Sequence, residues 1–366
     1  MIRNPVRRSL MMKRYLFRCL IPVLVTVICL TACAGSKNAS GEYDPEKLTF
    51  AAMDTIMSVT VYGGSSGMTG DIKALINHLD SLLSVTGKDS CIYAVNNSHG
   101  KPVEIPEDVT GLLSSSLKLC EETGGSLDVS VYPLSLAWGF TDSNYHVPSQ
   151  TDIRELLSKV DYRRVRINSD PDLTVPTYSI SVEDGMMLDL GAVAKGYASD
   201  RAAALLKNSG VTGAVLDLGG NIRTIGSRPD GSPWNIAIAS PDQDGFLGIL
   251  KTGEVSVITS GGYERYFEEN GHHYCHIIDP STGYPVENGV LSVTIVAENG
   301  LFCDALSTAL FVMGPDKARD FWASRTDFDY IMLTEDYGIY ITEGILDSFT
   351  PSGAYTDTPL TVLKGR

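Results

Sequence analysis

Apolar positions recur along the chain with two periods, and each period predicts a different kind of element. A period near 3.6 predicts helices over residues 72–83, 107–122, 193–209, 302–313 and 315–325. Alternation of apolar and polar side chains, or short apolar runs, predicts strands over residues 49–62, 213–218, 234–239, 254–259, 290–297, 329–334 and 337–342. We expect Glu335-Asp-Tyr-Gly338 to be a hairpin turn between the last two strands. Because strands and helices mix without a regular alternation, the pattern favours an α+β fold over a doubly wound parallel sheet.

The N-terminal segment has the organisation of an export signal. The first 18 residues carry six basic side chains and no acidic one, and an apolar run then extends from Leu20 to Leu30. That run has the length of a signal-peptide core and is short for a membrane span. It ends in Leu30-Thr-Ala-Cys33, the pattern of a lipobox. We therefore expect residues 1–32 to be a lipoprotein signal peptide, with an ordinary signal peptide and an incidental cysteine as the alternative.

Cleavage before Cys33 would change both the location and the charge of the protein. Palmitate-type acyl chains on Cys33 would anchor it to the cell membrane on the extracytoplasmic side, because several chains hold stably where one does not. Removal of residues 1–32 takes the formal net charge from −15 to −21, with 23 basic and 44 acidic residues left. So acidic a protein repels nucleic acid, and no basic stripe counters that repulsion. We expect residues 33–47 to be a tether and residues 48–362 to form one domain.

The four cysteines that follow Cys33 give no sign of a metal site. They lie at Cys91, Cys120, Cys275 and Cys303, widely spaced and without a Cys-x-x-Cys pair. Their spacing argues against zinc and favours isolated buried thiols.

Two glycine-containing turns are candidates for a phosphate contact. Leu188-Asp-Leu-Gly-Ala-Val-Ala-Lys-Gly-Tyr197 reads as a strand end that enters a helix, where free N–H groups suit phosphate oxygens. Its lysine, Lys195, stands one place before the P-loop position, so an ordinary NTPase loop is excluded and a plain helix start is an equal alternative. Leu216-Asp-Leu-Gly-Gly-Asn-Ile-Arg-Thr-Ile-Gly226 lacks the dinucleotide fingerprint, and a plain turn is the favoured interpretation.

Two further groups of residues are candidates for acid–base and metal chemistry. His276 stands beside an Asp-Pro-x-x-Gly turn, and its ordinary pKa suits a proton acceptor near neutrality. Asp304 and Thr308 are spaced i, i+4 on an apolar helix, so their oxygens share one face and form a hard donor set for Mg²⁺. A structural histidine, and a helix cap with a hydroxyl bonded to the backbone, are the competing interpretations.

Taken together and in order, these motifs resemble the ApbE-type flavin transferases, the FAD:protein FMN transferases. The resemblance runs from about Met53 to Met313. The matching pieces are Met53-Asp-Thr55, Lys88-Asp-Ser90, Leu127-Asp-Val-Ser-Val-Tyr-Pro-Leu-Ser-Leu-Ala-Trp-Gly-Phe140, Asp189 to Tyr197, Leu218-Gly-Gly220, Pro233-Trp234, Thr259-Ser-Gly261, His276-Ile-Ile-Asp-Pro280 with Gly283, and Asp304 with Thr308. The resemblance implies an α+β, T-fold-type architecture of mixed or antiparallel sheets with packed helices.

The resemblance also implies roles for individual residues. Positions that match FAD contacts are Met53, Ser126, Leu127, Asp128, Asp189, Lys195 and Ile278. Positions that match Mg²⁺ ligands are the backbone carbonyl of Ala192, Asp304 and Thr308, with Ser307 close to the ion, and His276 matches the proposed base. One departure concerns the adenine. The family often has an aromatic side chain where this chain has Thr86, so another residue would have to hold the ring, and Tyr93 is a candidate.

By this resemblance the expected reaction is Mg²⁺-dependent transfer of FMN from FAD to a threonine or serine hydroxyl of an exported or membrane acceptor protein, with release of AMP. The expected acceptors are redox-complex subunits or FMN-binding domains that carry an Asp-x-x-Ser/Thr-Gly-Ala-Ser/Thr-like motif. An Mg²⁺-dependent FAD pyrophosphatase and a flavin-binding lipoprotein without turnover are the alternatives, and the chain alone does not separate them.

Overall fold

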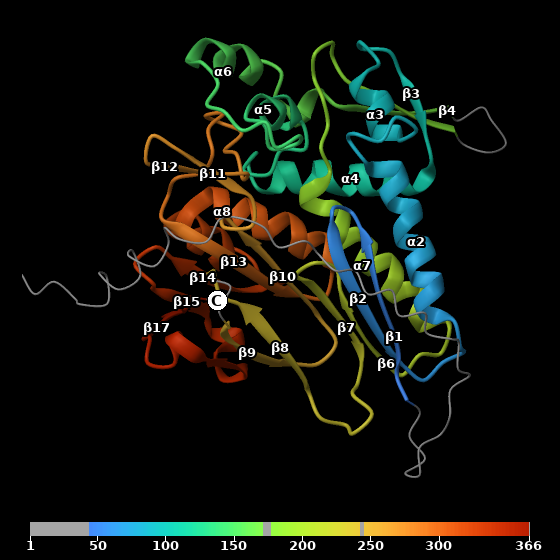
Figure 1. Ribbon diagram of the computed structural model, residues 1–366, viewed down its shortest axis with the longest axis vertical. Coiled ribbons are helices and arrows are strands. Elements are labelled where there is room, and N and C mark those ends of the chain that lie inside the picture. Colours follow the sequence, from blue (N-terminus) through green and yellow to red (C-terminus); the bar gives the residue numbers. More distant parts are fainter. Residues whose placement is uncertain (1–43, 171–176, 242–244, 366) are drawn as a thin grey trace, which may run out of the picture. The chain divides into compact units, whose positions relative to one another are not determined.

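The computed structural model describes residues 44–170, 177–241 and 245–365 (Figure 1). The expected signal peptide, Cys33 and the tether up to residue 43 lie outside the described residues and stay predictions. Within those described ranges, no helix is both long and apolar enough to cross a membrane. The strand β1 begins at Glu46, so the last two residues assigned to the tether are already part of the sheet.

A nine-stranded sheet forms the centre of the fold. Its strand order is β1-β2-β6-β7-β10-β13-β14-β15-β17, antiparallel throughout except for the last pair. The strands are β1 (Glu46–Ala52), β2 (Thr55–Tyr62), β6 (Gly213–Asp217), β7 (Asn221–Gly226), β10 (Ser256–Gly261), β13 (Val290–Ala297), β14 (Asp329–Thr334), β15 (Ile339–Thr342) and β17 (Leu360–Leu363). The expected α+β fold with antiparallel and mixed sheets is therefore confirmed.

Helices cover one face of this sheet. They are α2 (Met68–Leu83), α7 (Gly191–Asn208) and α8 (Gly300–Ala323), and α4 (Glu107–Glu122) packs against α7 and α8. Helix α7 crosses α8 where Gly196 meets Gly300, and a Cβ atom on Gly196 would lie 2.2 Å from the Gly300 carbonyl oxygen. Only a residue without a side chain permits this approach. The close crossing brings the first turns of α7 beside the first turns of α8.

A smaller sheet covers the other face. Its order is β16-β9-β8, formed by β8 (Trp234–Ala239), β9 (Phe246–Thr252) and β16 (Phe349–Pro351). Because successive side chains of a strand point to opposite faces, the central strands contribute side chains to two hydrophobic cores, one on each face of the sheet. On β10, Val257 belongs to the core against β8 and β9, whereas Ile258 belongs to the core against the helices. This alternation fixes which β10 side chains face α8.

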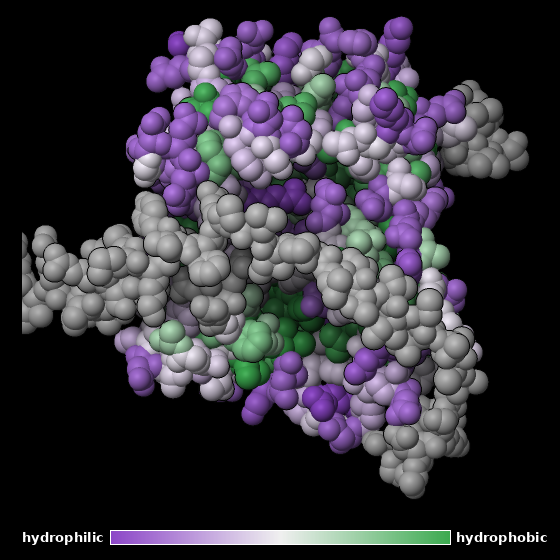
Figure 2. Space-filling view, in the orientation of Figure 1, coloured by the Kyte–Doolittle hydropathy of each residue, from purple (hydrophilic) through white to green (hydrophobic). Residues whose placement is uncertain are grey.

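A third group of elements lies at one end of the helical layer. It includes α5 (Tyr132–Ala137), α6 (Gln150–Leu157) and the hairpin of β11 (Tyr266–Glu269) and β12 (His272–Cys275), whose small core is built around Trp138 (Figure 1). Beside it lie α3 (Cys91–Asn96) and the sheet β3-β5-β4, with β3 (Val103–Ile105), β4 (Arg166–Asp170) and β5 (Thr177–Ser181). Figure 2 shows mainly hydrophilic side chains over α3, α5 and α6, as expected for a solvated end.

The predicted strand over residues 49–62 is wrong in one respect, because it is two strands joined by a tight turn. Met53 and Asp54 form the turn with φ of 47° and 58°, and β1 pairs with β2 on either side of it. The left-handed conformation usually calls for glycine or asparagine, neither of which stands here, so the turn gave no signal. The buried positions are Phe50 and Ala52 before the turn and Met57, Val59 and Val61 after it, so the alternation changes phase at the turn.

The predicted helices 302–313 and 315–325 are the two parts of α8. Gly314 (φ 75°, ψ 176°) breaks the helical conformation, and Pro315 follows it. Proline lacks an N–H group, so the carbonyl of Phe311 would lose its helical partner. Asn288 replaces that partner, since its Nδ2 donates to the Phe311 carbonyl at 2.8 Å. The kink lies beyond Thr308 and leaves the candidate metal face on the regular part.

Candidate active site

Asp189 lies at the entrance of α7 and is fixed by two hydrogen bonds. Its backbone N–H donates to the Val129 carbonyl at 2.8 Å, and its Oδ1 accepts from the Gly191 N–H at 2.7 Å. The first bond places the segment around residue 129 beside the turn. Burial raises the pKa of Asp189, and the nearby cations Arg265 and Lys195 oppose that rise. The carboxylate is thus held at the start of α7 with positive charge facing it.

The turn before α7 is not an open cradle for phosphate. The Gly191 N–H donates to the side chain of Asp189, and the N–H groups of Val193 and Ala194 donate to the Leu190 carbonyl at 3.0 and 2.8 Å. The expectation of free amides here is therefore wrong for these three groups, because the turn satisfies them itself. These three N–H groups are therefore not free to bind an anion.

Two such side chains are Lys195 and Arg265. Both lower the pKa of Asp189 and of Glu264, so both lie near these carboxylates. Neither forms an ion pair within 4.0 Å in the described part of the chain, although that part holds thirteen other ion pairs. Asp54, from the turn between β1 and β2, raises the pKa of Asp189 and so lies on the same site. Two positive side chains without close acidic partners suit an anionic substrate.

His276 faces this charged group as a neutral base. Its Nδ1 lies 3.2 Å from the Arg265 carbonyl oxygen, which can only accept a hydrogen bond. The Nδ1 atom therefore carries the proton, and Nε2 keeps its lone pair. Desolvation, with the positive charges of Arg265 and Lys195, lowers the pKa of His276 to about 4. The imidazole is consequently unprotonated at neutral pH, the state that a proton acceptor requires.

Asp304 lies where α8 crosses α7 and is 4% exposed. Its Oδ2 accepts a hydrogen bond of 2.8 Å from the Gly196 N–H. In a helix that same N–H faces the carbonyl four residues earlier, which belongs to Ala192. The Gly196 N–H therefore lies beside both the Asp304 carboxylate and the Ala192 carbonyl, which are two of the predicted metal ligands.

The oxygen atoms around Asp304 suit a hard cation. Within the described ranges, no lysine, arginine or histidine lies within 4.0 Å of this buried carboxylate. A buried carboxylate normally has a positive partner, and a divalent cation would supply one. The Thr308 hydroxyl lies one helical turn further along α8, and carboxylate, carbonyl and hydroxyl oxygens are the donors that Mg²⁺ prefers. The residues present therefore fit the predicted ion.

The three residues of the stretch 126–128 serve the fold in different ways. Leu127 is buried in the main core, and the partly exposed Ser126 precedes it. The carboxylate of Asp128 accepts from the Ser130 N–H and hydroxyl at 2.8 and 2.6 Å, and from the Tyr162 N–H at 3.1 Å. The side chain of Asp128 is thus occupied by the fold, so a ligand beside this stretch would meet its backbone. The hydrogen bond from Asp189 to Val129 places that backbone at the site.

The two remaining FAD-contact positions are Met53 and Ile278. Met53 lies in the turn beside Asp54, and its N–H donates to Asp80 Oδ2 at 3.0 Å. Ile278 follows His276 by two residues and is buried against Trp138. Both positions therefore belong to segments that also carry a charged or titratable site residue.

The position expected to hold the adenine is polar and exposed. The hydroxyl of Thr86 lies 3.3 Å from that of Ser84, in the loop after α2. Tyr93 is partly exposed on α3 and packs outside the main core clusters. Tyr93 remains a candidate for the adenine contact, and Thr86 offers no ring.

Four site residues had no role in the sequence-based interpretation. Asp54, Ser260, Glu264 and Arg265 lie in or beside motifs that the resemblance used, and their positions alone indicated no partner. Asp54 and Arg265 share the neighbourhood of Asp189, and Glu264 lies near Lys195 and Asp304. Ser260 contacts the hydroxyls of α8. Glu264 and Arg265 follow the Thr259-Ser-Gly261 motif within four residues. This closeness is the feature of the sequence that could have indicated them.

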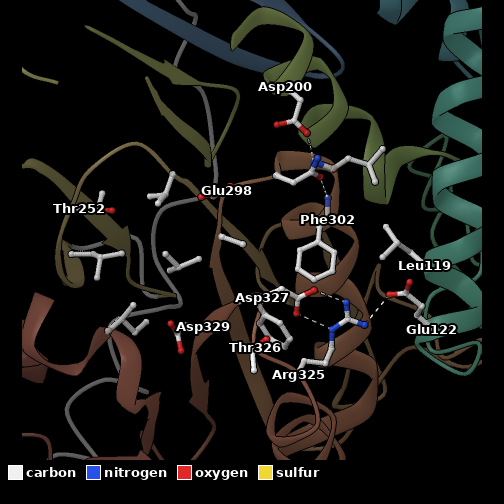
Figure 3. A pocket seen from close by; sticks show the side chains of 18 of the residues that line it. Leu119, Glu122, Asp200, Thr252, Glu298, Phe302, Arg325, Thr326, Asp327 and Asp329 are labelled. Atoms are coloured by element: carbon white, nitrogen blue, oxygen red, sulfur yellow. Dashed lines mark hydrogen bonds and ion pairs between the residues drawn. The ribbon is translucent and has the colours of Figure 1, made fainter. Parts of the chain in front are cut away.

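A large cavity elsewhere on the described part of the chain has a different character (Figure 3). It encloses about 950 Å³ beside the N-terminus of α8, and its lining includes none of the predicted site residues. Figure 3 shows its guanidinium, Arg325, between Glu122 and Asp327, at 2.8 and 2.6 Å. The same group also lies over the ring of Phe302 at 5.3 Å. The charge of Arg325 is thus already compensated by two carboxylates.

Comparison with known proteins gives one consistent result. Residues 53–332 match the model of the ApbE family. A FAD:protein FMN transferase of Treponema pallidum is 30% identical over 343 residues, which cover 89% of this chain and 94% of that protein. A FAD:protein FMN transferase of Vibrio cholerae is 32% identical over 257 residues, 69% of this chain and 75% of the relative.

Solved structures agree with these relatives. The ApbE protein of Thermotoga maritima superposes with a TM-score of 0.77 at 32% identity, over 83% of this chain and 99% of that protein. The flavinyl transferase ApbE of Pseudomonas stutzeri gives 0.71 at 29% identity, over 80% and 91%. The site combines a neutral histidine, two cations without close acidic partners and a buried carboxylate. These groups are of the kinds that phosphoryl-transfer enzymes use. Within that class, the chain belongs to the ApbE family.

Proposed function

We propose that this protein transfers FMN from FAD to a threonine or serine hydroxyl of an acceptor protein and releases AMP. One observation carries the proposal. His276, Asp304 and the pair Asp189 and Lys195 come from three distant stretches of the chain, and each lies near Glu264 or Arg265. The names of the relatives, FAD:protein FMN transferases, support the same substrate.

Binding of FAD rests on Lys195 and Arg265 in this account. The pyrophosphate of FAD is anionic, and both side chains lack an ion-pair partner within the described residues. Charge-assisted hydrogen bonds from such groups are about twice as strong as neutral ones. Because the N–H groups of Gly191, Val193 and Ala194 are already used, these two cations provide the charge-assisted part of the recognition.

His276 moves the proton in the transfer step. The acceptor hydroxyl oxygen forms a bond to the FMN-side phosphorus, and the bond from that phosphorus to the oxygen of AMP breaks. The hydroxyl proton passes to Nε2 of His276, whose Nδ1–H is fixed on the Arg265 carbonyl. General-base assistance of this kind contributes about 10²- to 10⁴-fold to a rate. AMP leaves with the electron pair of the broken bond.

Asp304, Thr308 and the carbonyl of Ala192 are the residues that would hold Mg²⁺. When bound there, the ion would offset negative charge on the phosphate oxygens and on the leaving AMP. The buried carboxylate without a basic neighbour is the feature of this chain that favours a cation at that position.

The acceptor and the location complete the proposal. We propose an acceptor with an Asp-x-x-Ser/Thr-Gly-Ala-Ser/Thr-like motif, exported or bound to the membrane, and a lipid anchor on Cys33 that keeps the enzyme near it. Every site residue lies at or beyond Met53. Substitution of Cys33→Ser should therefore move the protein from the membrane to the soluble fraction and leave its activity on a soluble acceptor unchanged.

The decisive experiment separates transfer from hydrolysis and from simple binding. Residues 34–366 are incubated with FAD, Mg²⁺ and an acceptor domain, and the products are resolved on a denaturing gel and by chromatography. A fluorescent acceptor band with AMP supports the proposal. Free FMN and AMP with an unlabelled acceptor would indicate a pyrophosphatase instead. FAD binding without AMP would leave only a flavin carrier.

A further inference from the structure

Ser260 contacts the two α8 hydroxyls at the candidate metal face. It lies near the end of β10, and its Oγ is 2.7 Å from Ser307 Oγ and 3.3 Å from Thr308 Oγ1. Ser307 in turn donates its hydroxyl hydrogen to the Asp304 carbonyl at 2.8 Å. Four oxygen atoms from β10 and α8 therefore form one chain of hydrogen bonds.

The chemistry of the groups fixes the direction of this chain. A carbonyl oxygen only accepts, and each hydroxyl has a single hydrogen to donate. Ser307 donates its only hydroxyl hydrogen to the Asp304 carbonyl. The hydrogen bond between Ser260 and Ser307 must therefore use the Ser260 hydrogen. The hydrogen of Ser260 is then used, so Thr308 must donate to Ser260. The Thr308 hydrogen points at Ser260, and the lone pairs of Thr308 Oγ1 are left for another partner.

We propose that Ser260 is a positioning residue that presents Thr308 Oγ1 as a lone-pair donor to a divalent cation beside Asp304. The inference rests on the proposed function only in that it takes the cation site to be real. A threonine inside a helix otherwise tends to donate to the carbonyl four residues earlier, here that of Asp304. Ser307 already occupies that carbonyl and Ser260 accepts the Thr308 hydrogen, so both serines counter this tendency.

The neighbouring Thr259 provides a matched control. It points to the opposite face of the sheet, where its Oγ1 lies 2.8 Å from Thr294 Oγ1 on β13. Ser260→Ala and Thr259→Val each remove one hydroxyl of the same strand, with little change of volume. Only the first breaks the chain to Thr308.

The test is Mn²⁺ binding, followed by electron paramagnetic resonance of free Mn²⁺ with saturating FAD and a protein-free FAD control. Groups that hydrogen-bond to a metal ligand typically contribute 10- to 100-fold to metal affinity. We expect Ser260→Ala to weaken Mn²⁺ binding about 10-fold, Thr259→Val to stay within about twofold, and Ser260→Thr to restore it. Ser260→Cys, which keeps a weaker donor of similar size, should lie between and serves if the alanine variant does not fold.

The outcomes separate the inference from the function on which it rests. Equal affinity of the wild type and of correctly folded Ser260→Ala would overturn the role of Ser260 and leave the cation site standing. A wild type that binds no Mn²⁺ would overturn the cation site itself and the role of Ser260 with it. Equal losses in Ser260→Ala and Thr259→Val would also overturn the positioning role, since a general loss of packing would then explain both.

Discussion

The cavity beside the N-terminus of α8 and the site around Asp189 show that size and chemistry need not coincide. The cavity encloses about 950 Å³, yet its Arg325 is paired with two carboxylates and lies over aromatic rings. The site holds Lys195 and Arg265 without a close acidic partner in the described residues, together with a neutral His276. Cations held in close ion pairs stabilise a fold, whereas cations that lie near carboxylates without a close ion pair can still bind an anionic ligand.

The largest expected effect on the rate of FMN transfer comes from substitution of Asp304. Asp304→Asn keeps the shape and removes the negative charge, so stabilisation of several kcal/mol by a bound cation is lost. We expect FMN transfer to fall by about a thousandfold, measured as the initial rate of flavin incorporation. Asp327→Asn in the cavity is the matched control and should transfer FMN within about twofold of the wild type. Transfer by Asp304→Asn at the wild-type rate would remove the assigned metal site.

The next effect concerns the base. His276→Gln should slow transfer about 10²- to 10⁴-fold and leave FAD affinity within about twofold, because the side chain acts on the acceptor hydroxyl. Fluorescence titration gives the affinity, and single-turnover labelling gives the rate. An unchanged rate would exclude His276 as the proton acceptor.

The lowered pKa of His276 adds a pH dependence. A base works in its unprotonated form, and burial with two nearby cations lowers the pKa to about 4. The single-turnover rate should therefore stay flat as pH falls from 8 to about 5 and drop below that. A drop centred near 6.5, the ordinary value for histidine, would show that the imidazole is solvated in the working enzyme.

A pair of substitutions compares the two regions directly. Lys195→Met removes a cation that has no close ion pair in the described residues. A hydrogen bond to a charged group contributes about 1.5–3 kcal/mol, so we expect FAD affinity to fall about 10- to 100-fold. Arg325→Met removes a compensated cation and should leave FAD affinity unchanged. It should instead lower the melting temperature, because Glu122 and Asp327 lose their partner. The reverse pattern, with weakened FAD binding only in Arg325→Met, would place the flavin in the cavity.

The smallest effect is a gain. Thr86→Tyr introduces a ring at the exposed position where the family often has an aromatic side chain. Stacking contributes about 0.5–1.5 kcal/mol, so FAD affinity should rise about two- to tenfold, with FMN affinity unchanged. Equal gains for FAD and FMN would show that the ring contacts the flavin half and not the adenine.

The sequence predicts most helices and many strands because their signals are local. The helix α4 (Glu107–Glu122) has the limits that its apolar period predicts, and β8 (Trp234–Ala239) alternates as its sequence does. The strand β9 gave no clear signal because Gly248 interrupts it. A Cβ atom at that position would lie 2.3 Å from the ring of Phe349, so the glycine is explained only by a contact across about a hundred residues.

The site is predictable in its residue types and less so in their partners. Asp128 and Asp189 were equivalent candidates in the sequence. In the structure the Asp128 carboxylate accepts hydrogen bonds from Ser130 and Tyr162, whereas cations lie near the Asp189 carboxylate. The difference depends on a segment 34 residues away from Asp128, which no local pattern shows. Ser260 was likewise quoted only as part of a motif, since its contact with Ser307 spans 47 residues.

The central claim is that the site around Asp189, and not the cavity beside the N-terminus of α8, transfers FMN. The most direct measurement is a single-turnover reaction in which AMP release and acceptor-bound flavin are quantified together for the wild type, Asp304→Asn and Arg325→Met. The account predicts one AMP for each flavin bound in the wild type and in Arg325→Met, and neither product in Asp304→Asn. Loss of both products in Arg325→Met, with full transfer in Asp304→Asn, would contradict it.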